Sequence, residues 1–432
     1  MISMNLHQAN ALIGGTLIGK AIQFRGISTD SRTDCTGTLF VALKGEYFNG
    51  EQFCQQAIDN GAVAILTTHS IDVEAPQLIV EDTLRSLSIL AKNWAKQCQA
   101  KIIAITGSNG KTTVKNMINS ILSQNNRCSA TIGNLNNEIG VPLTLCRIHP
   151  EDDFAVVEMG AAKLGDISWL ISLVNVHTAV ITNVSAAHIG RFGSFENIVK
   201  EKGQIISTLN EGDWAILPID DAHFSTWKNS VASKVLSFGE NPQADINVSS
   251  LDGIQLPVAG KHNLSNAACA KAIALSCGMT EQDITKGLES FKPEMGRLEN
   301  LGIINGVQII NDAYNANPNS VKAAIDVLAE LKGSTALVLG DMAELGESSQ
   351  NLHQQMGEYA QENNIDYLFS IGNDSQFASQ KFDKGQHFKQ MDKLKVHLHN
   401  NWKNIDTLLV KGSRSMRLEN LINALIDSEK AA

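Results

Sequence analysis

Membrane-spanning and secretory segments are missing from this chain of 432 residues. No stretch approaches the roughly 20 consecutive apolar residues that a spanning helix requires, and the N-terminus lacks the basic region and apolar run of a signal peptide. The seven cysteines are scattered and form no Cys-x-x-Cys pair, which is typical of free thiols in a reducing compartment. These absences predict a cytoplasmic protein with no membrane insertion and no disulfide framework.

Basic residues are the minority among the charged residues. The 35 Lys and Arg against 45 Asp and Glu give a formal net charge of -10, whereas a general nucleic-acid-binding protein normally carries a basic stripe. A chain of this length exceeds one ordinary hydrophobic core, so two or three globular domains are expected. No nucleic acid is expected as a partner, and nothing in the sequence requires more than a monomer.

The first region, residues 1–82, alternates short apolar runs with turn residues. The runs 37–43 and 62–66 predict strands, and the helical spacing between them ends at Gly61. A periodic segment at 84–91 then predicts a helix that opens the second domain. Residues 1–82 are therefore interpreted as a small α/β module.

The remaining chain contains two series of alternating strands and helices, which is typical of mainly parallel sheets. The first series occupies residues 83–297 and the second residues 298–432, with a break near Phe291. The predicted fold class is therefore α/β in three domains, in which the N-terminal module precedes a central P-loop domain and a C-terminal Rossmann-like domain. Strands are predicted at 101–105, 154–157, 179–182, 214–217, 307–310, 336–339, 367–370 and 408–410, and helices at 113–123 and 318–331.

A glycine-rich loop, Thr106–Thr113, stands between a predicted strand and a predicted helix. Its two glycines let backbone N–H groups turn toward phosphate oxygens, and the helix N-terminus adds a positive end. Lys111 is placed to reach the β- and γ-phosphates of ATP, and the Thr112 hydroxyl is placed to bind Mg²⁺. Ile105 occupies the first glycine position of the strict Walker spacing, but the Lys-Thr pair disfavours a turn that merely caps a helix. The predicted phosphate-binding residues are Gly107, Ser108, Asn109, Gly110, Lys111, Thr112 and Thr113.

A carboxylate that holds magnesium is expected near this loop. Glu158 directly follows the strand at 154–157, at the carboxyl end of the sheet, and the alternative is an exposed carboxylate at a strand end. His188 follows another strand and is expected at the same sheet edge, although most single histidines are bystanders. Lys202 lies in a charged helical segment, and the residue pattern alone does not distinguish it from a solvated helix face.

At several separated motifs the sequence resembles the Mur ligases, the ATP-dependent amide-forming enzymes of peptidoglycan precursor synthesis. The resemblance covers essentially the whole chain and implies an acyl-phosphate intermediate. The motifs that carry it are Thr-Gly-Ser-Asn-Gly-Lys-Thr-Thr (106–113), Glu-Met-Gly-Ala (158–161), Thr-Asn-Val (182–184) leading to His188, Gly-Lys-His-Asn-Leu-Ser-Asn-Ala-Ala (260–268) and Gly-Arg-Leu-Glu (296–299).

Within the family, three segments resemble the branch that joins D-alanyl-D-alanine to UDP-N-acetylmuramoyl-tripeptide. They are 311–320 with Asn-Asp-Ala-Tyr-Asn-Ala-Asn-Pro-Asn-Ser, 339–346 and 411–415. The Asp-Asn-Pro-Arg signature of the enzymes that add diaminopimelate or lysine is absent. The resemblance therefore implies these two small-molecule substrates as partners, and it leaves open whether the tripeptide ends in diaminopimelate or lysine.

The resemblance also implies roles for single residues. Lys202 corresponds to a lysine that the family carbamylates, and its carbamate is expected to share the second of two Mg²⁺ ions with His188. The implied catalytic set is therefore Lys111, Glu158, His188 and Lys202, with Thr112, Glu158, His188 and carbamylated Lys202 as metal ligands. Further implied contacts are Asn263, Asn266, Arg297 and Asp312 for ATP, Ser31, Arg32 and Lys44 for the UDP moiety, and Tyr314, Asn315 and Asn317 for the dipeptide.

One segment departs from the family pattern, because Asn49-Gly50-Glu51 stands where relatives usually carry Asp-Gly-His. The detailed uridine contacts are therefore not implied. The alternatives are a sibling ligase that adds a single amino acid, a folylpolyglutamate-synthase-like ligase, and, in another class, a P-loop switch or regulatory ATPase. The last explains the glycine-rich loop but leaves the third domain with residues 311–320 without a role.

Overall fold

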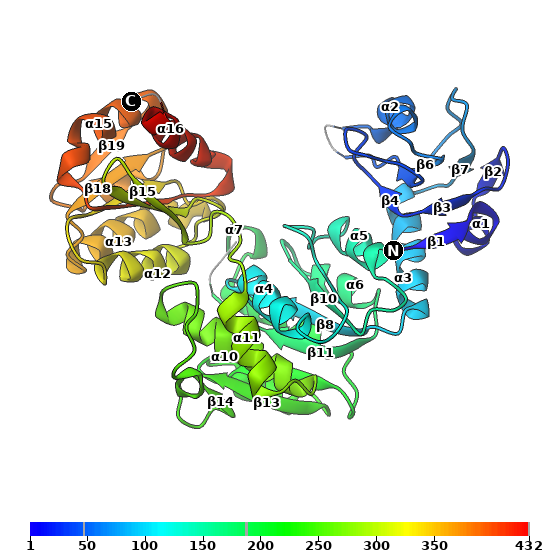
Figure 1. Ribbon diagram of the computed structural model, residues 1–432, viewed down its shortest axis with the longest axis horizontal. Coiled ribbons are helices and arrows are strands. Elements are labelled where there is room, and N and C mark those ends of the chain that lie inside the picture. Colours follow the sequence, from blue (N-terminus) through cyan, green and yellow to red (C-terminus); the bar gives the residue numbers. More distant parts are fainter. Residues whose placement is uncertain (46–47, 186–188, 431–432) are drawn as a thin grey trace.

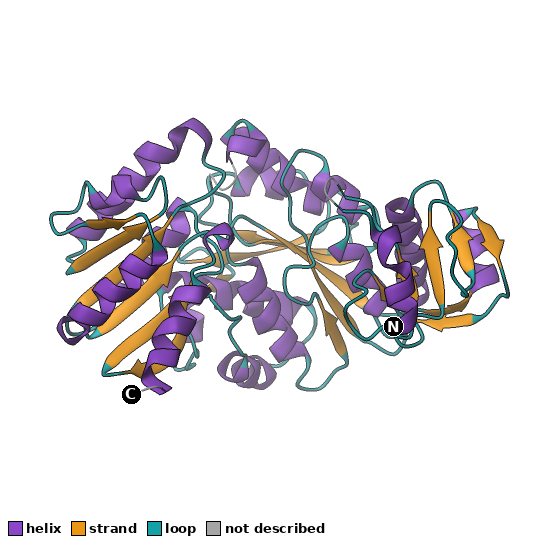
Figure 2. Ribbon diagram, turned by 90° about the horizontal axis from the view of Figure 1, so that it is seen from above, coloured by secondary structure: helices purple, strands orange, loops and turns teal. Residues whose placement is uncertain are grey.

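The computed structural model describes residues 1–45, 48–185 and 189–430, which form three lobes, each built on its own sheet. The lobes lie in a row with the central one in the middle (Figure 1; Figure 2). The three-domain α/β prediction is confirmed, and the proposed boundaries near residues 82 and 297 stay predictions.

The N-terminal lobe holds a five-stranded sheet in the order β2-β7-β6-β5-β4, in which only the β2–β7 pair is antiparallel. A separate antiparallel pair joins β1 to β3. Gly61 follows the end of the helical segment as expected. Its φ of +100° favours glycine, and a side chain would not fit there because a Cβ would lie 2.8 Å from Thr36 Cα. The elements are β1 (Ser3–Asn5), α1 (Leu6–Ile13), β2 (Thr16–Ile18), β3 (Gln23–Arg25), β4 (Ile27–Ser28), β5 (Leu39–Val41), α2 (Cys54–Asp59), β6 (Ala64–Thr67) and β7 (Gln77–Ile79).

The central lobe holds a seven-stranded sheet in the order β14-β13-β12-β11-β8-β10-β9, and every pair in it is parallel. Its elements are α3 (Thr83–Gln97), β8 (Lys101–Thr106), α4 (Lys111–Leu122), β9 (Cys128–Ala130), α5 (Gly140–Arg147), β10 (Phe154–Glu158), α6 (Asp166–Ile171), β11 (Val176–Ile181), α7 (Ile189–Phe192), α8 (Phe195–Gly203), β12 (Trp214–Pro218), α9 (Phe224–Asn229), β13 (Lys234–Gly239), β14 (Ile246–Asn247), α10 (Lys261–Ser276) and α11 (Glu281–Ser290).

Both faces of the central sheet are covered, which explains why its strands are continuous apolar runs. Successive side chains of a strand point to opposite faces, so Ile102 and Ala104 of β8 enter one core while Ile103 and Ile105 enter the other. The first core continues into the N-terminal lobe through α3, whose buried residues include Leu87. The second core lies under α4, α10 and α11. The central sheet is thus rigidly packed beneath the loops that follow its strands.

The C-terminal lobe holds a six-stranded sheet in the order β15-β16-β20-β17-β18-β19, in which only the β15–β16 pair is antiparallel. Asn317 caps α12, and the helix starts at Pro318 as predicted. The elements are β15 (Glu299–Ile304), β16 (Val307–Asp312), α12 (Pro318–Ala329), β17 (Thr335–Gly340), α13 (Ser349–Glu362), β18 (Tyr367–Ile371), α14 (Gln376–Ser379), β19 (Gln386–Phe388), α15 (Met391–Asn401), β20 (Thr407–Lys411) and α16 (Glu419–Lys430).

Candidate functional site

The glycine-rich loop connects the end of β8 to the start of α4, as the sequence predicts. Gly107 and Gly110 have φ angles of +151° and +80°, which a side chain rarely adopts. Asn183, which follows β11, fixes the loop from the side. Its Nδ2 donates to the Asn109 carbonyl at 3.0 Å, and its Oδ1 accepts from the Asn109 N–H at 3.0 Å. The neighbouring strand therefore sets the shape of the phosphate loop.

Lys111 lies at the first turn of α4, where its Nζ donates to the Gly107 carbonyl at 2.7 Å. Burial lowers the pKa of this lysine, the charge of Glu158 opposes that shift, and the charge of Arg297 adds to it. The ammonium is therefore a desolvated cation that faces other charged groups, which is the environment that strengthens binding of phosphate.

Glu158 is the last residue of β10, beside Ile105 of β8, and only 1% of it is exposed. Its Oε1 accepts from Asn136 Nδ2 at 2.7 Å, whereas its Oε2 is buried and has no hydrogen-bond partner among the residues that the structure describes. The alternative of an exposed carboxylate is therefore wrong. A buried carboxylate oxygen without a donor is costly unless a cation completes it, so this residue fits a magnesium ligand.

Lys202 lies on α8 and is only 4% exposed, so the interpretation of a solvated helix face is wrong for it, although it holds for the exposed Lys200. Burial, and next the charge of Lys111, lower the pKa of Lys202 to about 7, while Glu201 and Asp166 oppose the shift. A lysine with this pKa is partly neutral near neutral pH. His188, the other predicted ligand of the second metal, lies outside the described residues.

No group of three or more His, Cys, Asp or Glu side chains is arranged to hold a metal within residues 1–45, 48–185 and 189–430. Thr112 is buried at the start of α4, and its Oγ1 accepts from Arg297 Nη2 at 3.1 Å. Glu158 and Thr112 alone do not form a complete metal shell, which requires further ligands.

Two cavities meet at the phosphate loop. The smaller, of about 360 Å³, is lined by the loop and by Asn263 and Asn266 of α10. The larger, of about 930 Å³, is lined by Glu158 and Lys202 and extends away from these asparagines. The residues that line both cavities are Ser108, Lys111, Arg297, Tyr314 and Asn315. Lys111 therefore lies where the two cavities meet.

Residues of the C-terminal lobe complete the smaller cavity. Asn317 Nδ2 donates to Asn109 Oδ1 at 2.7 Å across the domain boundary, and the Arg297 guanidinium lies 4.2 Å from the Tyr314 ring centroid. The buried Arg297 Nε has no hydrogen-bond partner among the described residues. Arg297 and Glu158 both line the larger cavity, and an N–H without an acceptor together with a carboxylate oxygen without a donor suits a ligand that carries both phosphate and a cation.

Asp312 is held by a residue that the sequence prediction did not include. Lys411 Nζ donates to Asp312 Oδ2 at 2.6 Å and to the Asn315 carbonyl at 2.9 Å, and Lys411 lines the smaller cavity. The available signal was the position of Lys411 at the carboxyl end of β20, because β20 pairs with β16 and brings Lys411 opposite Asp312. Asn183 and Asn136 were missed as well, since their importance lies in contacts across the sheet.

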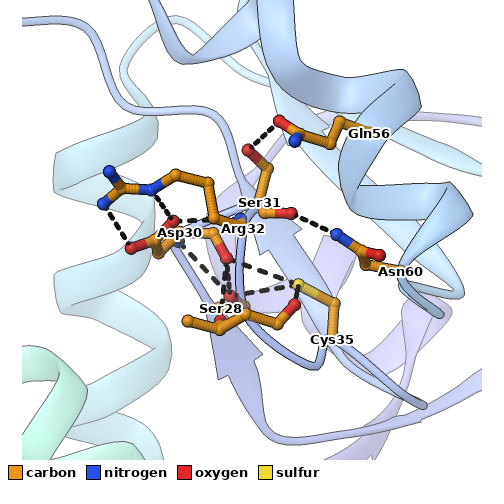
Figure 3. Close-up of polar contacts among 8 residues, drawn as sticks. Ser28, Asp30, Ser31, Arg32, Cys35, Gln56 and Asn60 are labelled. Carbon is orange, nitrogen blue, oxygen red and sulfur yellow. Dashed lines mark hydrogen bonds and ion pairs between the residues drawn. The ribbon is translucent and has the colours of Figure 1, made fainter.

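The residues predicted to contact the UDP moiety lie in the N-terminal lobe and line neither cavity. Figure 3 shows Ser31 pointing toward Gln56, while Arg32 turns back on Asp30. The side chain of Arg32 is 80% exposed, and Lys44 is exposed as well. The structure therefore leaves Arg32 and Lys44 at the surface and buries Ser31, and it does not bring these three side chains together with the phosphate loop.

Glu51, which replaces the usual family histidine, has a structural contact of its own. Its Oε1 accepts from Thr67 Oγ1 at 2.8 Å and from the N–H and Oγ1 of Thr68 at 2.9 and 2.7 Å. Burial is the largest single effect on the pKa of Glu51 and raises it. The hydrogen bonds from Thr68 and Thr67 lower the pKa and together outweigh burial, so the net pKa is lowered. This carboxylate ties the end of β6 to the 3-10 helix Gly50–Phe53 that precedes α2.

Gly110→Ala is expected to weaken binding of Mg·ADP by about 100-fold, because the loop geometry would be displaced. An added Cβ would lie 2.3 Å from Asn266 Oδ1, and the left-handed backbone adds strain of about 1–2 kcal/mol. Gly253→Ala is the matched control, because Gly253 has φ +90° and open space around a Cβ. Calorimetric titration should show normal affinity in the control; equal losses in both variants would mean that backbone strain alone matters.

None of the helices that the structure describes is both long and apolar enough to cross a membrane. The cysteines are all free thiols, four of them buried.

Comparisons with known proteins agree along the whole chain. Family models match in three consecutive parts, the Mur ligase family catalytic domain at residues 23–105, the Mur ligase middle domain at 105–274 and the Mur ligase glutamate ligase domain at 296–414. The UDP-N-acetylmuramoyl-tripeptide--D-alanyl-D-alanine ligase of Escherichia coli is 40% identical, covering 98% of this chain and 99% of that protein. The enzyme of the same name from Bacillus subtilis is 34% identical over 99% of both chains.

Solved structures give the same result. MurF from Acinetobacter baumannii superposes with a TM-score of 0.90 at 33% identity, covering 99% of both chains. The MurF ligase of Thermotoga maritima, solved in complex with ADP, superposes with a TM-score of 0.81 at 26% identity, covering 94% of this chain and 99% of that one. This chain, with its glycine-rich loop between two cavities, belongs to the Mur ligase family.

Proposed function

We propose that the chain is an ATP-dependent ligase that joins D-alanyl-D-alanine to UDP-N-acetylmuramoyl-tripeptide through an acyl-phosphate intermediate. The observation that carries this proposal is the pair of cavities that meet at Lys111 and Arg297. The full-length likeness to relatives named for this reaction supports the choice of substrates.

The first chemical step joins two anions, the terminal carboxylate of the tripeptide and the γ-phosphate of ATP. One carboxylate oxygen attacks phosphorus, the bond between the β- and γ-phosphates breaks, and ADP leaves. Lys111 lines both cavities and is positioned to neutralise charge at their junction. The Arg297 Nε lacks a hydrogen-bond acceptor among the described residues and is available to a phosphate oxygen.

The second step forms the peptide bond. The dipeptide amine attacks the acyl carbon, the bond from that carbon to the phosphate oxygen breaks, and inorganic phosphate leaves. Tyr314 and Asn315 line both cavities from the C-terminal side, and we assign them with Asn317 to the region where the dipeptide approaches. Enclosure of the acyl phosphate between the lobes excludes water, which would otherwise hydrolyse it.

We further propose that magnesium binds beside the loop, held by Glu158 and Thr112, with His188 and carbamylated Lys202 at a second ion. Bound magnesium would supply positive charge that offsets the repulsion between the two anionic substrates. The orphaned Glu158 Oε2 supports this assignment. The low pKa of Lys202 supports carbamylation, because only a neutral amine attacks carbon dioxide. The free cysteines support a location in the reducing cytoplasm.

Phosphate release tests the substrate assignment. With ATP and UDP-N-acetylmuramoyl-tripeptide, D-alanyl-D-alanine is expected to stimulate sustained release, whereas single amino acids are not. Parallel reactions should offer shorter UDP-linked precursors with single amino acids, which are the substrates of sibling ligases. Stimulation only in those reactions would contradict the assignment and leave the ligase class intact. Release that requires no amine at all would favour a regulatory ATPase.

A further inference from the structure

The segment 290–297, which joins the central lobe to the C-terminal lobe, runs antiparallel along α4. It contacts positions 120, 116 and 112, which are four residues apart and therefore share one face of the helix. The three successive contacts are Ser290 Oγ with Ser120 Oγ at 3.4 Å, Asn116 Nδ2 to Glu294 Oε2 at 3.1 Å and Arg297 Nη2 to Thr112 Oγ1 at 3.1 Å. The linker thus approaches the phosphate loop one helical turn at a time.

Lys115 is a buried cation on α4, three residues after Thr112, and the proposed mechanism gives it no role. Only 2% of it is exposed, and its Nζ lies 3.9 Å from Glu294 Oε2. Burial lowers the pKa of Lys115, the charges of Glu158 and next of Glu294 oppose that shift, and the charge of Arg297 adds to it. A buried ammonium is expensive unless carboxylates compensate it, so Glu294 is drawn toward α4 by charge as well as by its hydrogen bond.

We propose that Lys115 is a positioning residue: its charge holds Glu294 against α4 and thereby places Arg297 at the nucleotide site. Only two residues lie between Glu294 and Arg297, and one of them, Gly296, donates its N–H to Glu299 Oε2 at 2.9 Å, which keeps the connection short and defined. Because α4 begins at the phosphate loop, the same helix contacts the phosphate site at its first turn and binds Glu294 of the linker through Lys115 and Asn116. This inference rests on the proposed function only in that Arg297 contacts the nucleotide.

The ion pair between Lys115 and Glu294 matters because Arg297 has a long side chain that contacts two lobes. Its guanidinium contacts Thr112 on α4 and stacks on Tyr314 in the C-terminal lobe. A displacement of the linker by a fraction of a side-chain length changes both contacts, and errors of this size are costly at a site that requires fixed geometry. Removal of the Lys115 charge is therefore expected to weaken nucleotide binding without direct loss of a ligand contact.

The test is a double-mutant cycle on affinity for Mg·ADP, measured by calorimetry on the full chain. Lys115→Met keeps the buried volume and removes the charge, and Glu294→Gln keeps the acceptor for Asn116 and removes the opposite charge. Each single variant is expected to bind about tenfold more weakly, and the double variant about as weakly as either one, because both remove the same interaction. Lys271→Met is the matched control, since Lys271 is a buried lysine on α10 paired with Glu281 away from the linker. It is expected to bind Mg·ADP normally.

Two results would overturn the proposal. Normal affinity of Glu294→Gln for Mg·ADP would show that the Lys115–Glu294 ion pair does not position Arg297. This variant decides the question even where Lys115→Met fails to fold. Losses that multiply in the double variant would mean that Lys115 acts independently of Glu294, either on the nucleotide directly or through Glu158. Failure of the unaltered protein to bind Mg·ADP would instead contradict the proposed function, so the two ideas are tested separately.

Discussion

Lys202→Ala is expected to lower the rate of ligation by about 1000-fold, because it removes the group that we propose to carry the carbamate. Lys202 is buried beside the large cavity, and its pKa of about 7 leaves a substantial neutral fraction near neutral pH. Below that pKa the ammonium predominates and cannot react with carbon dioxide. Ligation by the unaltered protein is therefore expected to fall as the pH drops below about 7.

Lys200→Ala is the control for this experiment, because Lys200 is exposed on the same helix. It should retain normal turnover. Short-chain carboxylic acids are expected to restore part of the activity of Lys202→Ala, since they replace the carboxylate of the carbamate. Carbon-13 bicarbonate should also give a carbamate signal that is absent from Lys202→Ala. Full turnover in this variant would remove Lys202 from the mechanism.

Glu158→Gln is expected to lower turnover by about 100- to 1000-fold at saturating magnesium, because an amide cannot supply the anionic oxygen. The Asn136 contact to Oε1 is compatible with the amide, so the fold should persist. The charge of Glu158 also offsets those of the buried Lys111 and Lys115, and its removal leaves these two cations less compensated. Thermal unfolding without magnesium should therefore occur at a somewhat lower temperature in the variant.

Glu211→Gln provides the comparison, because Glu211 is an exposed carboxylate in the same lobe. Its turnover and its dependence on magnesium should match those of the unaltered protein. If Glu158→Gln keeps both properties as well, the metal binds elsewhere.

The strands that could be predicted are those covered on both faces. β8 and β10 appear as uninterrupted apolar runs, because each alternate side chain enters one of two cores. β9 and β14 are edge strands of three and two residues, too short for any pattern. β15 is the antiparallel edge of its sheet, and its residues are partly exposed, so no apolar run marks it.

The sequence predicts that Glu158 and Lys202 belong to the site, but it does not predict that both are buried. Lys200 and Lys202 are two residues apart on α8 and therefore point to opposite sides of the helix. Local sequence cannot decide which one faces the sheet, and the structure buries Lys202. Asn183 and Lys411 belong to the motifs 182–184 and 411–415, but they act through partners 74 and 99 residues away in sequence, so only the strand order reveals their contacts.

Transfer of phosphate from ATP to the tripeptide carboxylate at the junction of the two cavities can be tested directly. UDP-N-acetylmuramoyl-tripeptide labelled with oxygen-18 in its terminal carboxylate should be incubated with ATP, magnesium and D-alanyl-D-alanine, and the released phosphate analysed by mass spectrometry. The acyl-phosphate route predicts one labelled oxygen in each phosphate, with an equal amount of peptide bond formed. Unlabelled phosphate would contradict it, because ATP would then have been hydrolysed by water.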